Sequence, residues 1–152
     1  MPDVGTSDGI AGKRERVSMI GWHGTQGDFD SFDETYFGSD ENRSPNGRLG
    51  VWIFLREGLA TGIGARVLEV EVDVTEERIL RVPNARMLRD HHEANRSDDP
   101  HAWFDALRAQ MRADGYQAIV VRERDGNDMM AVVLDLDCIT RVTDLSAVPG
   151  PR

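Results

Sequence analysis

Apolar and polar residues alternate along several short stretches of the chain. The clearest is ARVLEVEVDV, residues 65–74, in which Leu68, Val70 and Val72 alternate with acidic side chains. A period of two residues puts the two kinds of side chain on opposite faces of a strand, so this stretch predicts a half-buried strand. Apolar and β-branched runs bounded by turn residues predict further strands. They are VSMIGWH (17–23), GVWIFL (50–55), RILRV (78–82), QAIVVRE (117–123) and MMAVVLDL (129–136).

One stretch, DDPHAWFDALRAQMRADGY (98–116), has helical periodicity instead. Large apolar side chains recur there at helical spacing, at Trp103, Phe104, Leu107 and Met111. This pattern is the buried stripe of an amphipathic helix. Either Asp98 or Asp99 serves as the N-cap, Pro100 suits the first turn, and Gly115 ends the helix.

The remaining signals concern turns and connections. Asp125-Gly126 separates the last two strands and predicts an antiparallel hairpin. A short helical turn is expected near residues 56–60, and the Gly-, Pro- and Asn-rich stretch 38–50 predicts a mobile loop. Many strands, one clear helix and long loops predict an α+β domain built mostly on antiparallel sheet. We expect a disordered segment at 1–16, a single domain at 17–142 and a flexible tail at 143–152.

Composition narrows the possible partners. The chain has 152 residues, of which 39% are hydrophobic, and its formal net charge is −9. An acidic surface repels phosphate backbones and anionic lipids, so nonspecific binding to nucleic acid or to a membrane surface is disfavoured. No apolar run is long enough to span a bilayer, and the first residues have no secretory signal pattern. We therefore expect a cytoplasmic protein without a membrane partner.

The metal-binding residue types do not form a persuasive site. Cys138 is the only cysteine, which excludes an internal disulfide and a multi-cysteine zinc site. Its place beside Ile139 favours a buried, inert thiol. His91-His92-Glu93 and His101 include ligand types, but two adjacent histidines do not share one face of a helix or strand. We interpret this segment as a solvated loop and expect no metal.

The stretch GWHGTQGDFDSFDET, residues 21–35, places His23 between Trp22 and a glycine directly after the first strand. A histidine in a turn commonly bonds only the local backbone, and Trp52, inside an apolar run, fits a plain core position. A ligand-binding interpretation depends instead on the order of the segments along the whole chain.

That order is WHGT, a pair of phenylalanines, GVWIF, RVLEVEV, the helix, DGYQAIVV and finally AVVLDLDCITRV. It resembles the ADP-ribosyltransferase fold over about residues 19–142. It is most similar to the histidine–tyrosine–acid branch that occurs in bacterial toxins and phage polyvalent proteins. The resemblance implies an NAD-dependent mono-ADP-ribosyltransferase, with NAD as the ADP-ribose donor. Such a protein would be a toxin or phage effector that modifies a protein or small-molecule acceptor.

The resemblance also implies roles for particular residues. His23 matches the histidine that hydrogen-bonds the adenosine ribose of NAD. Gly24 matches the residue whose backbone pairs with the nicotinamide carboxamide, and Thr25 would add a hydroxyl to the same edge. Trp52 falls where the family has a tyrosine under the nicotinamide ring, where a cationic pyridinium over an indole gains a cation–π contact.

The family acid, which stabilises the developing charge on the nicotinamide ribose, has no direct counterpart. Met130 occupies its place, and a thioether cannot supply that charge. Asp128 lies two residues earlier, hence on the same face of a regular strand and about 6.6 Å away. Asp128 becomes the candidate catalytic residue if the strand bulges after the Asp-Gly turn. Glu123 and Asp125 precede the turn and would contribute only in a longer hairpin.

Two classes of function remain open. One is the transferase, and the other is a catalytically silent relative that keeps the nucleotide pocket, or only the fold, as a binding or interaction module. Nucleic acid is the less favoured acceptor, because Arg43 and Arg48 in the 38–50 stretch are the only obvious positive charges near the expected site.

Overall fold

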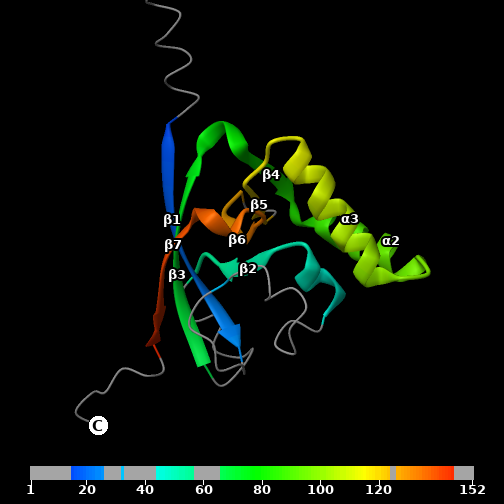
Figure 1. The fold of residues 1–152 in the computed structure, drawn as a ribbon, viewed down its shortest axis with the longest axis horizontal. Helices are drawn as coiled ribbons and strands as arrows, with labels where there is room; N and C mark the ends of the chain where they lie inside the picture. Colours follow the sequence, from blue (N-terminus) through cyan, green and yellow to red (C-terminus); the bar gives the residue numbers. More distant parts are fainter. Residues whose placement is uncertain (1–14, 26–31, 33–43, 57–65, 124–125, 146–152) are drawn as a thin grey trace, which may run out of the picture.

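The computed structural model describes residues 15–25, 32, 44–56, 66–123 and 126–145 (Figure 1). Its strands are β1 (Arg16–Thr25), β2 (Val51–Phe54), β3 (Arg66–Thr75), β4 (Ile79–Pro83), β5 (Ala118–Arg122), β6 (Asp128–Val133) and β7 (Ile139–Asp144). Its helices are α2 (Asn84–Arg96) and α3 (Pro100–Ala113), with the short 3-10 helices η2 (Pro45–Arg48), η4 (Glu76–Arg78) and η5 (Leu136–Cys138).

The strands form one seven-stranded sheet in the order β4-β5-β6-β2-β1-β3-β7. Its neighbouring strands are antiparallel except β4 and β5, which are parallel. Parallel neighbours need a long crossover connection, and here α2 and α3 supply it. The fold is therefore α+β with a mixed sheet, and the predicted antiparallel pattern holds apart from this one pair.

The sheet is divided into two parts that run across each other (Figure 1). One part contains β1, β3 and β7, the other contains β4, β5, β6 and β2, and the pair Trp22↔Phe54 joins them. Apolar side chains of β3 pack with those of β2, β5 and β6 to form an inner cluster between the two parts. The opposite side of β5, β6 and β2 packs against α2 and α3 in a helix-side cluster.

The second part of the sheet has two differently packed faces. The inner face bears Val51, Ile53, Val120 and Ala131, which belong to the inner cluster. The helix face bears Val121 and Val132, among others, which belong to the helix-side cluster.

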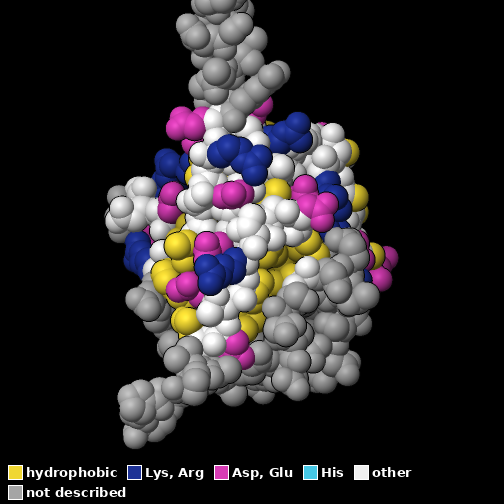
Figure 2. Space-filling model, turned by 60° about the vertical axis from the view of Figure 1, so that its left-hand side comes forward, with side chains coloured by type: hydrophobic (Ala, Val, Ile, Leu, Met, Phe, Trp, Pro, Cys, Tyr) yellow, Lys and Arg dark blue, Asp and Glu magenta, His cyan; other side chains and the backbone are white. Residues whose placement is uncertain are grey.

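The outer side of β1, β3 and β7 carries mixed side chains. Figure 2 turns this side forward and shows basic and acidic groups beside one another among hydrophobic ones. Arg141 lies 3.9 Å from Glu71, and the Ser18 hydroxyl donates to Asp73 at 2.6 Å. An antiparallel sheet with one buried and one solvated face accounts for the alternation in residues 65–74.

The bounds of five predicted strands and of the predicted helix are confirmed within one or two residues. The strand predicted at 129–136 ends three residues earlier, at Val133, and β7 was not predicted as a strand. The side chain of Asp99, and not that of Asp98, caps α3 by accepting a hydrogen bond from the Ala102 N–H at 3.2 Å. Gly115 follows the helix with a φ of 95°, a left-handed conformation that favours glycine.

The prediction of one helix is wrong, because α2 was not expected. Its buried positions are Met87, Asp90 and Ala94, with His91 half-buried beside them. Only two of these four residues are apolar, so the sequence shows no hydrophobic stripe. His91, His92 and Glu93, interpreted as part of a solvated loop, consequently lie on α2, and His101 lies on α3.

The prediction of a mobile loop at 38–50 needs correction for its second half. Residues 45–48 form η2, and Leu49 is completely buried in the helix-side cluster. A Cβ on Gly50 would overlap the Val133 carbonyl oxygen, so the chain packs tightly against β6 here. One buried leucine in a polar stretch is a weak sequence signal. Residues 38–43, the expected turn at 57–60, and the ends at 1–14 and 146–152 lie outside the described residues.

Candidate functional site at the split between β1 and β2

The neighbouring strands β1 and β2 diverge just before His23. All ten residues of β1 pair with β3, whereas in the described part of the chain β1 pairs with β2 only through Trp22↔Phe54. A Cβ on Gly21 would lie 2.6–2.8 Å from side-chain atoms of Ile53, so glycine permits the close crossing that precedes the split. Among the described residues, β1 beyond Trp22 thus continues in its ladder with β3 and leaves its ladder with β2.

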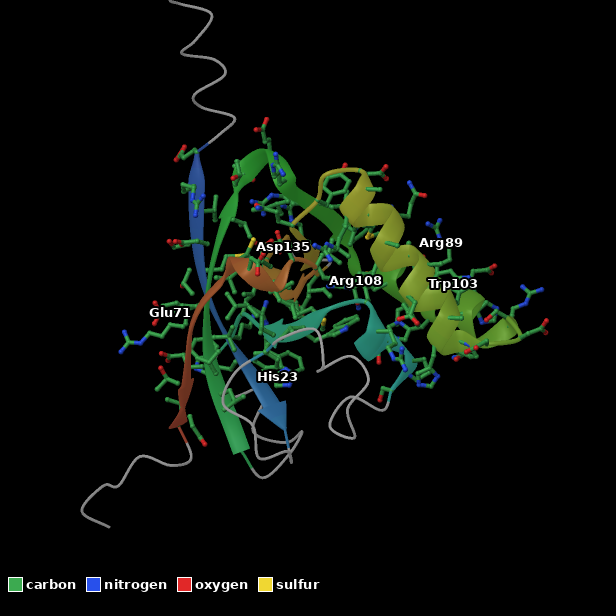
Figure 3. The ribbon with its side chains drawn as sticks, in the orientation of Figure 1. His23, Glu71, Arg89, Trp103, Arg108 and Asp135 are labelled. Carbon is green, nitrogen blue, oxygen red and sulfur yellow. The ribbon has the colours of Figure 1, made fainter. Side chains whose placement is uncertain are left out.

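The His23 ring spans this split. Its Nδ1 lies 2.7 Å from the Trp52 carbonyl oxygen, and a carbonyl only accepts, so Nδ1 carries the hydrogen. Burial lowers the pKa of His23, and the weaker effect of the bond to Trp52 raises it. In the neutral ring Nε2 is therefore the nitrogen without a hydrogen. Phe32 packs edge-on at 5.1 Å, and Figure 3 shows His23 near the end of β1, away from Trp103 and Arg108 on α3.

His23 lies on the inner side of the sheet. It shares a strand face with Met19 and Gly21, of which Met19 packs against the inner cluster and Gly21 faces Ile53. Its ring partner Phe32 is itself a buried member of that cluster. The predicted role of His23 toward an adenosine ribose stays a prediction, but its ring is held in one place by a hydrogen bond and an aromatic contact.

A β-bulge at the start of β6 determines where Asp128 lies. On β5, Val121 and Arg122 are consecutive, but their partners on β6 are Met130 and Asp128, so Met129 is an extra residue. The Met129 carbonyl accepts a hydrogen bond from the Leu55 N–H at 2.9 Å, which ties the bulge to the end of β2. A β-bulge after the Asp-Gly turn was the condition for Asp128 to be the candidate catalytic residue, and this bulge is present.

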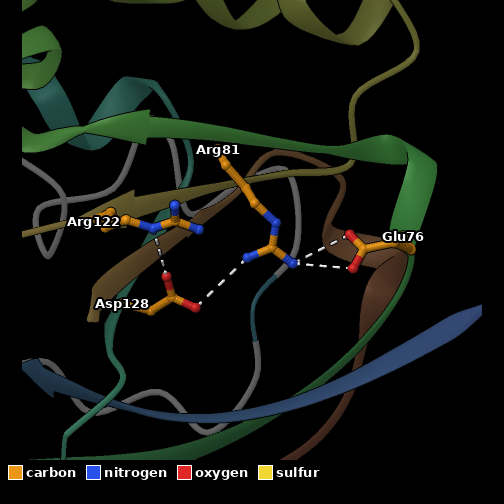
Figure 4. A network of polar contacts seen from close by, with 4 residues as sticks. All are labelled: Glu76, Arg81, Arg122 and Asp128. Carbon is orange, nitrogen blue, oxygen red and sulfur yellow. Dashed lines mark hydrogen bonds and ion pairs between the residues drawn. The ribbon is translucent and has the colours of Figure 1, made fainter. Parts of the chain in front are cut away.

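The Asp128 carboxylate contacts two arginines (Figure 4). Its Oδ2 lies 3.6 Å from Nη1 of Arg81 on β4, and its Oδ1 lies 3.6 Å from Nε of Arg122 on β5. Leu80 and Val82 pack on the helix face, as does Val121, so strand alternation places both arginines on the inner face. Asp128 therefore projects to the same side of the sheet as His23.

This arrangement corrects one prediction from the sequence. A regular strand would put Asp128 and Met130 on one face, but the extra residue reverses the alternation between them. Met130 packs in the helix-side cluster, whereas Asp128 meets the inner-face arginines. Met130, at the place of the family acid, and Asp128, its candidate replacement, consequently point to opposite sides of the sheet.

The indole of Trp52 lies on the opposite side of the sheet from the His23 ring, although the Trp52 carbonyl bonds that ring. It alternates with Val51 and Ile53 and packs in the helix-side cluster. Its Nε1–H donates to the Asn46 carbonyl at 2.8 Å, and its ring meets His91 edge-on at 6.0 Å. These contacts are those of a packing residue. The predicted stacking of Trp52 on nicotinamide stays a prediction, and none of these contacts favours it.

Gly24 and Thr25, the other residues predicted for the site, lie at the end of β1. They pair with Val67 and Arg66 in the β1–β3 ladder, and the Thr25 side chain lies outside what is described.

Sequence reasoning missed Arg81 and Arg122. An arginine inside the apolar run RILRV was the available signal, because a charge at an inward strand position needs a partner.

Metal and membrane sites have little support in the described ranges. There, no three His, Cys, Asp or Glu side chains gather closely enough to hold a metal ion. His91 instead bonds the Met87 carbonyl at 2.8 Å and packs against Phe104. Neither α2 nor α3 is long and apolar enough to cross a bilayer.

Comparison with known proteins adds little to this picture. No family model matches the sequence, and no curated protein matches it. Among solved structures, one described as "Crystal structure of an anti-CRISPR protein" is similar, with 14% sequence identity and a TM-score of 0.46. The match covers 85% of this chain and 96% of that chain. A likeness at this level carries no information about the activity of this chain.

Proposed function

We propose that the chain binds NAD at the split between β1 and β2 and transfers its ADP-ribose to a protein or small molecule. The observation that carries this proposal is the placement of His23 and Asp128 on the same side of the sheet, where the extra residue Met129 puts Asp128. The fold is then ADP-ribosyltransferase-like, in keeping with the order of segments along the sequence.

The spacing of the two side chains suits the two ends of a dinucleotide. His23 follows Trp22, which pairs with Phe54, and Phe54 pairs in turn with Met130 on the strand that carries Asp128. His23 is level with Ala131 on β6, three residues beyond Asp128. The two residues are thus two strand spacings apart across the sheet and offset along it, roughly 12–14 Å apart in a flat sheet. NAD has two riboses joined by a diphosphate, so one ribose can meet His23 while the other meets Asp128.

His23 would accept a hydrogen bond from the adenosine ribose through Nε2, because Nδ1 already donates to Trp52. The backbone of Gly24, on the edge that leaves the β1–β2 ladder, would pair with the nicotinamide carboxamide. The absence of a side chain at Gly24 allows that approach.

Asp128 would act on the bond that breaks. The ribose C1′–nitrogen bond of NAD cleaves with its electron pair going to nicotinamide, which leaves neutral, while the sugar becomes cationic. A carboxylate beside that sugar stabilises the transition state more than the ground state. A nucleophilic atom of the acceptor then bonds C1′, and its proton passes to solvent.

A protein or small molecule remains the preferred acceptor. Arg48, one of two arginines considered for nucleic-acid binding, lies 3.2 Å from Asp105 on α3, which offsets its charge. Arg43 lies outside the described residues. Binding to oligonucleotides that weakens steeply with salt would reverse this preference.

The test is nicotinamide release from NAD, with transfer of labelled ADP-ribose, by the full chain. Asp128→Asn should lower turnover strongly while NAD still raises the melting temperature, because the carboxylate acts in the transition state. Asp98→Asn, an exposed aspartate beyond the far end of α2, should behave like the wild type. Equal turnover in wild type and Asp128→Asn would refute the role of Asp128, and loss of release in Glu123→Gln instead would assign it to Glu123.

A catalytically silent binding module is the second candidate, favoured by the contacts of Asp128 itself. Both carboxylate oxygens face guanidinium groups, as they would in an ordinary structural ion-pair network. Binding of NAD by the wild type without nicotinamide release identifies this case. The absence of any NAD-induced rise in melting temperature at millimolar NAD counts against both candidates.

A further inference from the structure

We propose that Glu76 and Arg81 are positioning residues that hold the Asp128 carboxylate for NAD cleavage. This inference rests on the function proposed above. It concerns residues on β4 and on the turn before it, which no sequence motif singled out.

The contacts form a chain from Glu76 to Asp128 (Figure 4). Nη2 of Arg81 donates to both carboxylate oxygens of Glu76, at 3.1 and 3.2 Å. Nη1 of the same guanidinium faces Asp128 Oδ2 at 3.6 Å. A guanidinium is planar and rigid, so fixing one terminal nitrogen also fixes the direction of the other.

Glu76 is anchored at its backbone. It is the first residue of η4, and its N–H donates to the Glu15 carbonyl at 2.8 Å, beside the start of β1. At the other end of the chain of contacts, the Leu55 N–H holds the Met129 carbonyl of the bulge. Arg81 thus connects a fixed turn to a fixed bulge.

The contacts of Asp128 leave its carboxylate able to accept a hydrogen bond from a substrate. At 3.6 Å, the contacts with Arg81 and Arg122 are ion pairs longer than a normal hydrogen bond. A carboxylate has about four lone-pair positions, so its oxygens keep acceptor capacity for a ribose hydroxyl. The arginines therefore orient the group without saturating it.

Exposure distinguishes positioning from a role in stability. The side chains of Glu76, Arg81 and Asp128 are 44%, 37% and 39% exposed. Ion pairs at such exposure contribute little to folding stability. A displacement of about 1 Å at a reacting centre, by contrast, can lower a rate roughly a hundredfold.

The decisive variant is Glu76→Gln, which keeps the size of the side chain and removes its charge. We expect its kcat for nicotinamide release to fall roughly ten- to hundredfold, with KM nearly unchanged, because the displaced group acts in the transition state. Arg81→Lys, which keeps the charge and loses the planar fork, should fall similarly. Glu76→Asp should recover part of the loss. Glu77→Gln, the neighbouring exposed glutamate of η4, is the matched control and should equal the wild type.

A second measurement does not depend on activity. The backbone amide resonances of Asp128 and Met129 should shift in Glu76→Gln and Arg81→Lys and stay in place in Glu77→Gln. Unchanged kcat and unmoved resonances in Glu76→Gln, with release abolished in Asp128→Asn, would overturn the positioning role and leave the proposed function standing. If the wild type releases no nicotinamide, the proposed function fails, and unmoved resonances would then overturn the positioning of Asp128 as well.

Discussion

The burial of His23 makes the stability of the folded chain depend on pH. Its pKa is lowered in the folded chain, mainly by burial, from an ordinary value of 6.5. As pH falls below 6.5 the unfolded state takes up a proton that the folded state refuses until a lower pH. The free energy of unfolding therefore falls in that window, by at most about 1.4 kcal/mol per pH unit, and the full contribution is present above pH 6.5.

We expect this acid sensitivity to decrease in His23→Gln. Urea unfolding at pH 7.5 and pH 5.5 measures it, and the drop between the two should be smaller in His23→Gln than in the wild type. His92→Gln, which removes an exposed histidine on α2, should retain the wild-type drop. The same drop in all three chains would show that His23 is not held neutral.

The thiol of Cys138 should be unreactive in the folded chain. Burial raises its pKa to about 11, with the Asp135 charge adding to the effect. Because only the thiolate is nucleophilic, iodoacetamide at pH 8 should label the native chain far more slowly than the chain in concentrated urea. Mass spectrometry gives the labelled fraction directly, since the chain has one cysteine. Rapid stoichiometric labelling without urea would contradict the buried position.

At the scale of elements, the cap of α3 can be tested against its neighbour. Asp99→Ala removes the acceptor for the Ala102 N–H and should lower the free energy of unfolding by about 1 kcal/mol. Asp98→Ala, one residue earlier and equally exposed, should change it much less. Urea titration of both variants is sufficient, and equal losses would mean that the capping bond is not formed in solution.

The elements also show which features a sequence reveals. Six of the strands and α3 were predictable because their apolar side chains recur at a simple period and their ends carry turn residues. β7, with only two apolar residues in ITRVTD, was not predicted as a strand. The helix α2 was not, because its buried side includes Asp90 and His91. Amphipathic pattern reading counts apolar residues, and a helix that buries polar groups escapes it.

The candidate site was predictable only in part. His23 and Asp128 could be identified as candidates, but their relation across the sheet could not. One extra residue, Met129, reverses which side Asp128 occupies, and bulge positions cannot be read from apolar alternation. Arg81 was missed because an arginine in a short strand is ordinarily exposed, and Glu76 becomes its partner only through the turn between β3 and β4.

At the scale of the whole molecule, the junction between the two parts of the sheet depends on Gly21. Gly21→Ala would bring a methyl group within 3 Å of Ile53 and should lower the free energy of unfolding by about 1–3 kcal/mol. Ile53→Ala removes two of the three atoms that the new methyl group would meet. Gly21→Ala should therefore cost less in the Ile53→Ala background, and a double-mutant cycle in urea measures the difference. Strictly additive losses would exclude this contact as the cause.

The wide separation of His23 and Asp128 along the chain has a consequence for synthesis and folding. β1 is synthesised well before β6, and β2, which lies between them in the sheet, pairs with both. Pairings between distant segments carry a loop-closure cost and form late. The nascent chain therefore has no assembled candidate site until β6 has left the ribosome. An incomplete product that stops before β6 lacks Asp128 and could not carry out the NAD cleavage proposed above.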